Sequence, residues 1–182
     1  MRRKNVTSEM MMTYIEQALL LLMQSRPYSD ITIGEITEKA GVNRSTYYRH
    51  FPTKDSIIKS YLNAIMEEYQ NRFRNLRSDD YALYLRTMFE TFYEKRADLL
   101  LIHQSGLSYL LLDVLMNRFR FEDIPEKEQF QMSYHIGGIH NNMLLWFAHS
   151  MRETPAEMTE IAIQYGPKKQ MTLFGTEHSH DL

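Results

Sequence analysis

The sequence predicts an all-α protein of about nine helices, and three observations support this class. Apolar residues recur at helical spacing through most of the 182-residue chain. The Thr-x-x-Glu pattern that begins many helices stands at two of the expected helix starts, at Thr32 and Thr154. No segment shows the alternation of apolar and polar residues that a half-buried strand requires. We therefore expect a three-helix head at residues 1–53, a helical bundle at 54–165 and a flexible tail at 166–182.

The helices are expected in a simple order. The first ends at Arg26-Pro27, a long one beginning at Lys54 links the head to the body, and the last begins with Pro155 behind a Thr154 cap. The expected spans are about 6–25, 32–39, 43–50, 54–77, 80–94, 96–104, 106–120, 126–151 and 155–165.

Residues 32–43 carry the first part of the most specific pattern in the chain. Thr32 and Glu35 form a capping box, so a short helix begins there. Gly41 is placed to end it, because glycine adopts the left-handed conformation without strain. Asn43 can cap the next helix after only three or four connecting residues. This spacing indicates a helix-turn-helix, although the same arrangement occurs in helical proteins that never bind DNA.

The second helix of this motif is polar in an unusual way. It surrounds the apolar Tyr47 and Phe51 with hydroxyl, imidazole and guanidinium groups, and it has no acidic residue between Asn43 and His50. An acid-free polar surface suits a DNA groove and its phosphates, whereas an ordinary solvated helix face is usually rich in Glu and Lys. After Pro52, Thr53 caps a further helix whose first residue, Lys54, is a cation expected near a phosphate.

Residues 10–62 resemble the N-terminal DNA-binding domain of the TetR family of bacterial regulators. The shared pattern is an aromatic residue or Leu, then Tyr, any residue, His, Phe, two residues, and Lys with an acid; Asp55 and Tyr47 are its minor departures. The resemblance implies phosphate contacts by Thr32, Tyr48, His50 and Lys54, with Arg44, Ser45, Thr46 and Tyr47 nearest the bases of double-stranded DNA. The matching residues are Ile33, Ile36, Ala40, Gly41, Val42, the run Thr46 to Phe51, Lys54 and Asp55.

Composition and charge agree with this interpretation. Residues 1–60 hold nine Lys and Arg against six Asp and Glu, and the remainder holds twelve against seventeen. A basic head on an acidic body has the sign expected of a DNA-binding protein. The absence of cysteine suits a reducing cytoplasm, and no apolar run approaches the roughly 20 residues of a membrane span. No metal site is indicated, because His135 and His140 are spaced for different helix faces. The sequence also shows no cofactor-binding or catalytic motif.

The helix at 126–151 predicts a homodimer. It is apolar on two sides, one with Phe130, Tyr134 and Leu145 and the other with Met132, Ile136 and Trp146, so one side can meet a second subunit. Gly137-Gly138 suggests close approach of backbones, and a pseudo-palindromic operator needs a two-fold protein. The segment from Tyr134 to Met158 also resembles, more loosely, the dimer-forming helices of many TetR-type regulators. The expected interface residues are Ile136, Ile139, Met143, Met158 and Ile161.

The middle of the body is expected to bind an unknown small-molecule effector. Aromatic residues and Met with a few polar groups are typical of an apolar pocket, but the same residues at helical spacing also form plain cores. The family resemblance alone implies that the protein acts as a repressor. Two alternatives remain open: a regulator or co-activator controlled by a protein partner, and an all-α enzyme. The expected pocket residues are Phe89, Phe92, Tyr93, His103, Tyr109, Met116 and Trp146.

Overall fold

The structure, a computed structural model, describes residues 2–118 and 125–166, so the tail expected at 166–182 lies almost entirely outside the described residues. Nine α-helices and one short 3-10 turn account for the described secondary structure, which contains no strand. The predicted all-α class is confirmed. The elements are α1 (Arg2–Met23), η1 (Tyr28–Asp30), α2 (Ile33–Ala40), α3 (Arg44–His50), α4 (Lys54–Leu76), α5 (Tyr81–Glu94), α6 (Arg96–Gln104), α7 (Tyr109–Arg118), α8 (Glu126–Ala148) and α9 (Pro155–Tyr165).

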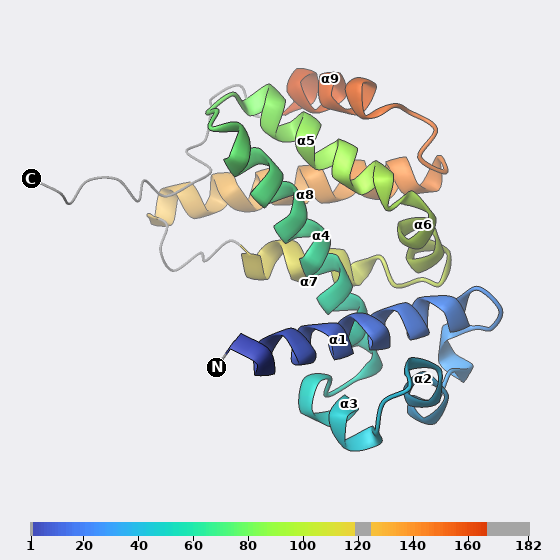
Figure 1. Ribbon diagram of the computed structural model, residues 1–182. Helices are drawn as coiled ribbons and strands as arrows, with labels where there is room; N and C mark the ends of the chain where they lie inside the picture. The colour runs from blue at the N-terminus through green and yellow to red at the C-terminus, as the bar shows by residue number, and fades with distance from the viewer. Residues whose placement is uncertain (1, 119–124, 167–182) are drawn as a thin grey trace, which may run out of the picture.

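The helices form an elongated arrangement with α2 and α3 at one end. In Figure 1 these two short helices lie below α1, whereas α5 and α9 lie at the opposite end of the molecule. Helix α4 runs from the α3 end upward into the body, where it packs against both α5 and α7. The long helix therefore connects α3 mechanically to the body.

Local capping explains where three helices begin. Thr32 and Glu35, Thr53 and Ser56, and Thr154 and Glu157 each form a reciprocal capping box, which satisfies amides that the first helical turn leaves unpaired. Gly41 ends α2 with φ 66°, the left-handed conformation predicted for it. The expectation for Asn43 was wrong in one respect: it stands at the N-cap of α3, but its side chain makes no capping hydrogen bond.

One continuous apolar core runs through the head and the body. In the head, Ile15, Ile36 and Phe51 are almost completely buried between α1, α2 and α3. Ile58 on α4 continues this core toward the body. Full burial of such side chains contributes about 1.5–3 kcal/mol each before entropy is counted. The three head helices are therefore held as one unit by packing, since α2 and α3, with 8 and 7 residues, are too short to be stable alone.

Among the described residues, no single helix is long and apolar enough to cross a membrane; α6 and α7 meet the length and composition criteria only as a pair, and they are bent by 119° relative to each other.

Candidate nucleic-acid interface

Helix α3 presents a polar surface at the end of the molecule. Arg44, Ser45, Tyr48 and Arg49 are exposed, and Tyr48 has 59% of its surface accessible. Thr46 and His50 are partly exposed beside them. The predicted DNA-contacting residues of α3 are therefore all accessible to solvent, with the exception of Tyr47. Hydroxyl, imidazole and guanidinium groups of this kind hydrogen-bond to base edges and phosphate oxygens.

Tyr47 corrects the expectation that it lies nearest the bases. Its side chain is 0% exposed and packs edge-on against Tyr48, with ring centroids 5.2 Å apart, and at 6.1 Å from Phe51. Burial also raises the pKa of its hydroxyl. The physical reason is helical spacing: residues four apart lie on the same side of a helix, so Tyr47 and Phe51 both face the core. Tyr47 thus anchors α3 from inside and holds the neighbouring polar residues outward.

Thr32 uses its hydroxyl inside the protein. Its Oγ1 donates to Glu35 Oε2 at 2.8 Å and accepts from the Glu35 amide at 3.2 Å, while its own amide donates to the same carboxylate. These bonds, together with an ion pair from Arg26, lower the pKa of Glu35 to about 2. A phosphate contact by Thr32 would have to compete with this capping box. Its predicted role in DNA binding stays a prediction.

Lys54 is likewise engaged within the chain. Its Nζ donates to the carbonyl oxygens of Tyr28 and Ile31, each at 2.7 Å, and lies 4.5 Å from the centre of the Tyr28 ring. A third carbonyl, that of Ser29, lies at 3.4 Å. The ammonium group has three donors, and all three have carbonyl partners here. Lys54 therefore ties the start of α4 to the connection between α1 and α2, a structural role that the sequence pattern did not indicate.

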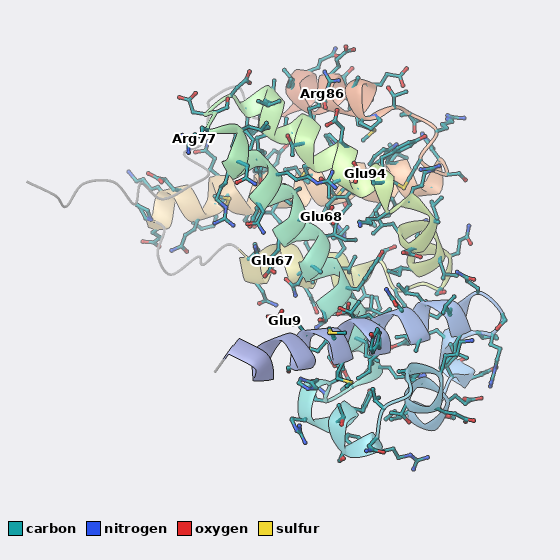
Figure 2. All side chains as sticks on the ribbon, viewed as in Figure 1. Glu9, Glu67, Glu68, Arg77, Arg86 and Glu94 are labelled. Carbon is teal, nitrogen blue, oxygen red and sulfur yellow. The ribbon has the colours of Figure 1, made fainter. Side chains whose placement is uncertain are left out.

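The charge distribution separates α3 from the acidic part of the body. Figure 2 shows Glu67, Glu68 and Glu94 on α4 and α5, at a distance from α3. Glu68 and Glu94 are paired with Arg72 on the same side of the body. Helix α3 itself carries Arg44 and Arg49 and no acidic residue, a character that attracts a polyanion.

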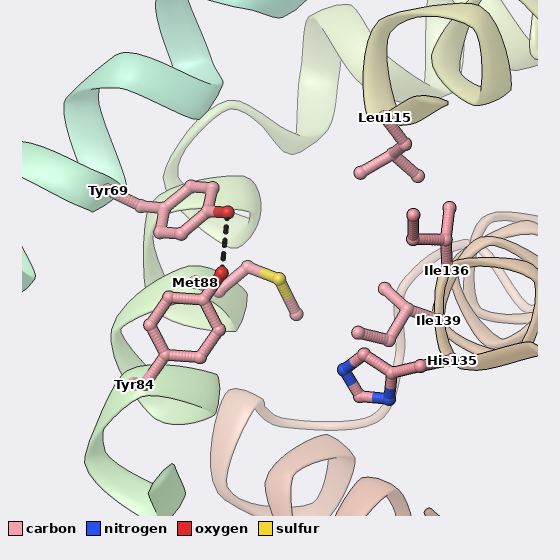
Figure 3. Close-up of a pocket in the computed structure, with 7 residues that line it drawn as sticks. All are labelled: Tyr69, Tyr84, Met88, Leu115, His135, Ile136 and Ile139. Atoms are coloured by element: carbon pink, nitrogen blue, oxygen red, sulfur yellow. Dashed lines mark hydrogen bonds between the residues drawn. The ribbon is translucent and has the colours of Figure 1, made fainter. Parts of the chain in front are cut away.

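The body contains a small apolar cavity between α4, α5, α7 and α8 (Figure 3). Its volume of about 10 Å³ is close to the least that can hold one water molecule. On one side of the cavity, the hydroxyls of Tyr69 and Tyr84 lie 2.9 Å apart in a hydrogen bond. His135 lies opposite, and burial lowers its pKa. The lining residues are Tyr69, Tyr84, Met88, Leu115, His135, Ile136 and Ile139.

None of the seven predicted pocket residues lines this cavity. Phe89 and Tyr93 instead pack against Trp146, with ring centroids 5.6 Å and 6.0 Å from the indole. Phe92 is buried in the same core. The alternative of plain core packing is what the structure shows for these four side chains.

The other three predicted pocket residues lie elsewhere. His103 Nδ1 is 2.8 Å from Ser108 Oγ, and Met116 is partly exposed on α7. Tyr109 is 54% exposed and donates its hydroxyl to Asp55 Oδ2 at 2.8 Å. Tyr109 therefore connects α7 to the start of α4. No sequence spacing could predict this contact, because the two residues are far apart in the chain.

The expected dimer residues are corrected on α8 and α9. Ile136, Met143 and Met158 are buried in the core of their own chain, so their side chains are not available to a second subunit. Ile139 and Ile161 are only partly buried. The two apolar sides of α8 exist as predicted, but the outward one is the other side, which carries Phe130, Tyr134 and Leu145.

This outward side forms an apolar stripe along α8. Phe130 and Tyr134 are 76% and 84% exposed, values unusual for large aromatic side chains. A Cβ atom added at Gly137 or Gly138 would meet no described atom within 4 Å, so packing within the described chain does not require these glycines. We refer to Phe130, Tyr134, Gly138 and Leu145 as the α8 stripe.

Comparison with known proteins finds a family profile that covers α2 and α3, and several relatives. Residues 17–61 match the profile of the bacterial regulatory proteins of the tetR family. The chain is 25% identical to the HTH-type transcriptional regulator EthR of Mycobacterium tuberculosis over 84 residues, covering 42% of this chain and 39% of EthR. It is 29% identical to the uncharacterized HTH-type transcriptional regulator YxbF of Bacillus subtilis over 129 residues, covering 71% of this chain and 32% of YxbF.

A third relative is the nucleoid occlusion factor SlmA of a Marinomonas species, 29% identical over 68 residues, which are 37% of this chain and 34% of SlmA. The chain thus spans between about a third and two fifths of the length of the curated relatives it matches.

Proposed function

Since the chain belongs to the tetR family of bacterial regulatory proteins, we propose that it regulates transcription by placing α3 in the major groove of operator DNA. The observation that carries this proposal is the exposed, acid-free α3, seated on the core by Tyr47 and Phe51 inside the segment that matches the family. We assign DNA binding to a head at residues 1–53 and control to a body at 54–165. Such a regulator works in the bacterial cytoplasm, where the DNA is.

Direct readout in this proposal belongs to three exposed or partly exposed residues of α3. Arg44, Ser45 and Thr46 lie in the first turn of the helix, the part that meets base edges in helix-turn-helix proteins. Tyr48 and His50 are assigned to phosphates. Most of the affinity then comes from phosphate contacts, so binding should weaken steeply as the salt concentration rises.

The α8 stripe is proposed as the homodimer interface. Three large apolar side chains lie along one accessible face, and a stable protein rarely leaves such a face in water. The two glycines near its centre each destabilise a helix by roughly 1 kcal/mol. No close contact within the described chain requires a glycine at either position. Close approach of a second α8 would supply the reason. A two-fold dimer then presents two copies of α3 to a pseudo-palindromic operator.

Control by a small-molecule effector is proposed for the body, with repression as the default state. An effector must bind a conformation with one separation of the two heads better than a conformation with another separation, because only differential affinity shifts a conformational equilibrium. At about 10 Å³ the cavity has no room for an organic ligand, so binding requires α5, α7 or α8 to move apart. Tyr84, Met88 and His135 would then be the first groups to contact the ligand.

Control by a protein partner is the second candidate, and the small volume of the described cavity is the observation that favours it. A signal received at the surface needs no such space. Tyr165 and Ile163 on α9 are exposed apolar residues where a partner could bind. Soaking the protein with a diverse compound library separates the two candidates: a compound that raises the melting temperature and displaces DNA supports the effector.

Selection of binding sites from random double-stranded DNA, followed by gel shift, tests the main proposal. Arg49→Ala and Tyr48→Ala should each weaken binding to the selected site at least about tenfold, since each removes an exposed polar group of α3. Arg86→Ala is the matched control, because Arg86 is an exposed arginine on α5 at the far end of the molecule. If wild-type protein selects no sequence, or if Arg49→Ala and Arg86→Ala bind alike, the docking of α3 is wrong.

A further inference from the structure

One carboxylate joins the head to the body. Asp55, in the first turn of α4, accepts a hydrogen bond on each of its two oxygens. Tyr28, in the connection between α1 and α2, donates to Oδ1 at 2.6 Å. Tyr109, at the first position of α7, donates to Oδ2 at 2.8 Å. The bond from Tyr28 is the largest of the effects that lower the pKa of Asp55, so the carboxylate is charged at neutral pH and both bonds are charge-assisted.

The head side of this junction is held rigidly. Lys54, the neighbour of Asp55, binds the carbonyl oxygens of Tyr28 and Ile31 and lies over the Tyr28 ring. The first turn of α4 thus binds the connection between α1 and α2 at two kinds of group. Lys54 binds its backbone carbonyls, and Asp55 binds the Tyr28 hydroxyl. Because α2 begins directly after this connection, with Thr32 as its cap, any rotation of the first turn of α4 carries α2 and α3 with it.

The body side depends on α7. This helix lies along α4, and three further links follow Tyr109: Asp113 pairs with Lys59 at 2.7 Å, and Arg118 bonds Gln70 and pairs with Glu67. The ion pair of Asp113 is substantially exposed and is expected to contribute little. None of these three links reaches a residue of the head. Among the described contacts between α4 and α7, only the Tyr109–Asp55 bond ends on a group that also binds the head, because the Asp55 carboxylate accepts from Tyr28 as well.

We propose that Tyr109 is a positioning residue for DNA binding, whose hydrogen bond to Asp55 sets the angle between head and body. In a dimer that angle fixes the separation of the two α3 helices, and so the spacing of half-sites that the protein accepts. The inference rests on the proposed DNA-binding function, which it extends from the identity of the contacts to their geometry. It gives Tyr109 a role distinct from the ligand contact that the sequence suggested.

Tyr109→Phe is the decisive variant, because it removes one hydroxyl from a side chain that is already half in water. The wild-type protein is expected to bind its selected palindrome at least about tenfold better than versions with one base pair inserted or deleted between half-sites, since each such change rotates and displaces one half-site. Tyr109→Phe should reduce that preference to less than about threefold, while its melting temperature stays close to that of wild type. Tyr165→Phe, which removes an exposed hydroxyl from α9, is the control and should keep the wild-type preference.

Hydrogen exchange of the free protein provides a readout that needs no DNA. The amides of Asp30 and Ile31 bond within the connection between α1 and α2, and Tyr109→Phe should make them exchange several-fold faster, with no change in α8 or α9. Unchanged exchange at these amides, or an unchanged spacing preference, would overturn the inference. Failure of the wild-type protein to select any DNA would instead contradict the proposed function, and the exchange result would still decide whether Tyr109 controls the head.

Discussion

The replacement Tyr47→Phe should stabilise the protein without affecting DNA binding. The Tyr47 side chain is completely buried, and its hydroxyl has no hydrogen-bond partner among the described residues. Phenylalanine keeps the ring that packs against Tyr48 and Phe51 and removes only that unpaired polar group. The change therefore isolates one hydroxyl in an otherwise preserved core.

The size of the effect follows from the cost of the buried hydroxyl. Leaving a buried donor without a partner costs about 1–3 kcal/mol relative to its hydrated state. A phenyl ring of the same shape avoids this cost, so the free energy of unfolding should rise by about 1 kcal/mol, the lower end of that range. For a chain of this length, such a gain raises the melting temperature by roughly 2–4 °C.

Tyr48→Phe is the matched control, because the two tyrosines are adjacent and one is exposed. Its hydroxyl is already in water, so stability should change by less than about 0.5 kcal/mol, but affinity for the selected DNA should fall several-fold. Urea unfolding and gel shift measure the two properties separately. A Tyr47→Phe protein that loses more than about 1 kcal/mol, or that keeps its fold and loses DNA affinity, would show that the hydroxyl has a partner and that the assignment of Tyr47 to the core is incomplete.

Three further predictions concern other parts of the structure. Lys54→Met should lower the free energy of unfolding by about 1–3 kcal/mol in urea titrations, because it removes the ammonium from its carbonyl partners; an unchanged midpoint would mean that these bonds contribute nothing. Leu145→Glu should raise the dimer dissociation constant roughly 100-fold in sedimentation experiments, since it buries a charge in the α8 stripe, and Asn117→Glu on α7, with the same added charge, should not. Burial lowers the pKa of His135 from 6.5, so below that pH the unfolded chain binds a proton that the folded one does not; stability should fall as the pH drops below 6.5, and His135→Gln should reduce that slope.

Local sequence predicted most of the helices and their starts. The capping boxes of Thr32 and Thr154 and the turn at Gly41 depend on contacts between residues a few positions apart, so their patterns are legible in the chain itself. The two apolar sides of α8 were also predictable, because helical periodicity separates them. Which side faces outward was not, since periodicity does not say which neighbour covers a face. The α5–α8 packing around Trp146 decided that question.

The expected pocket residues do not line the described cavity, for a related reason. Composition identifies residues able to line a pocket, but side chains as large as Phe92 and Trp146 fill whatever space their helices leave. Whether space remains is a property of how α4, α5, α7 and α8 pack together. The described cavity lies at Tyr84 and His135, which the sequence did not indicate as pocket residues.

The sequence by itself determined the helical class, the positions of the turns and the polar, acid-free character of α3, because each follows from contacts within a few residues. Only the tertiary structure decided that Tyr47 faces the core, that Lys54 binds backbone carbonyls and that Tyr109 meets Asp55. Those contacts join segments that are distant along the chain, and their geometry is set by the packing of whole helices. Local patterns carry no information about such distances until the helices are in place.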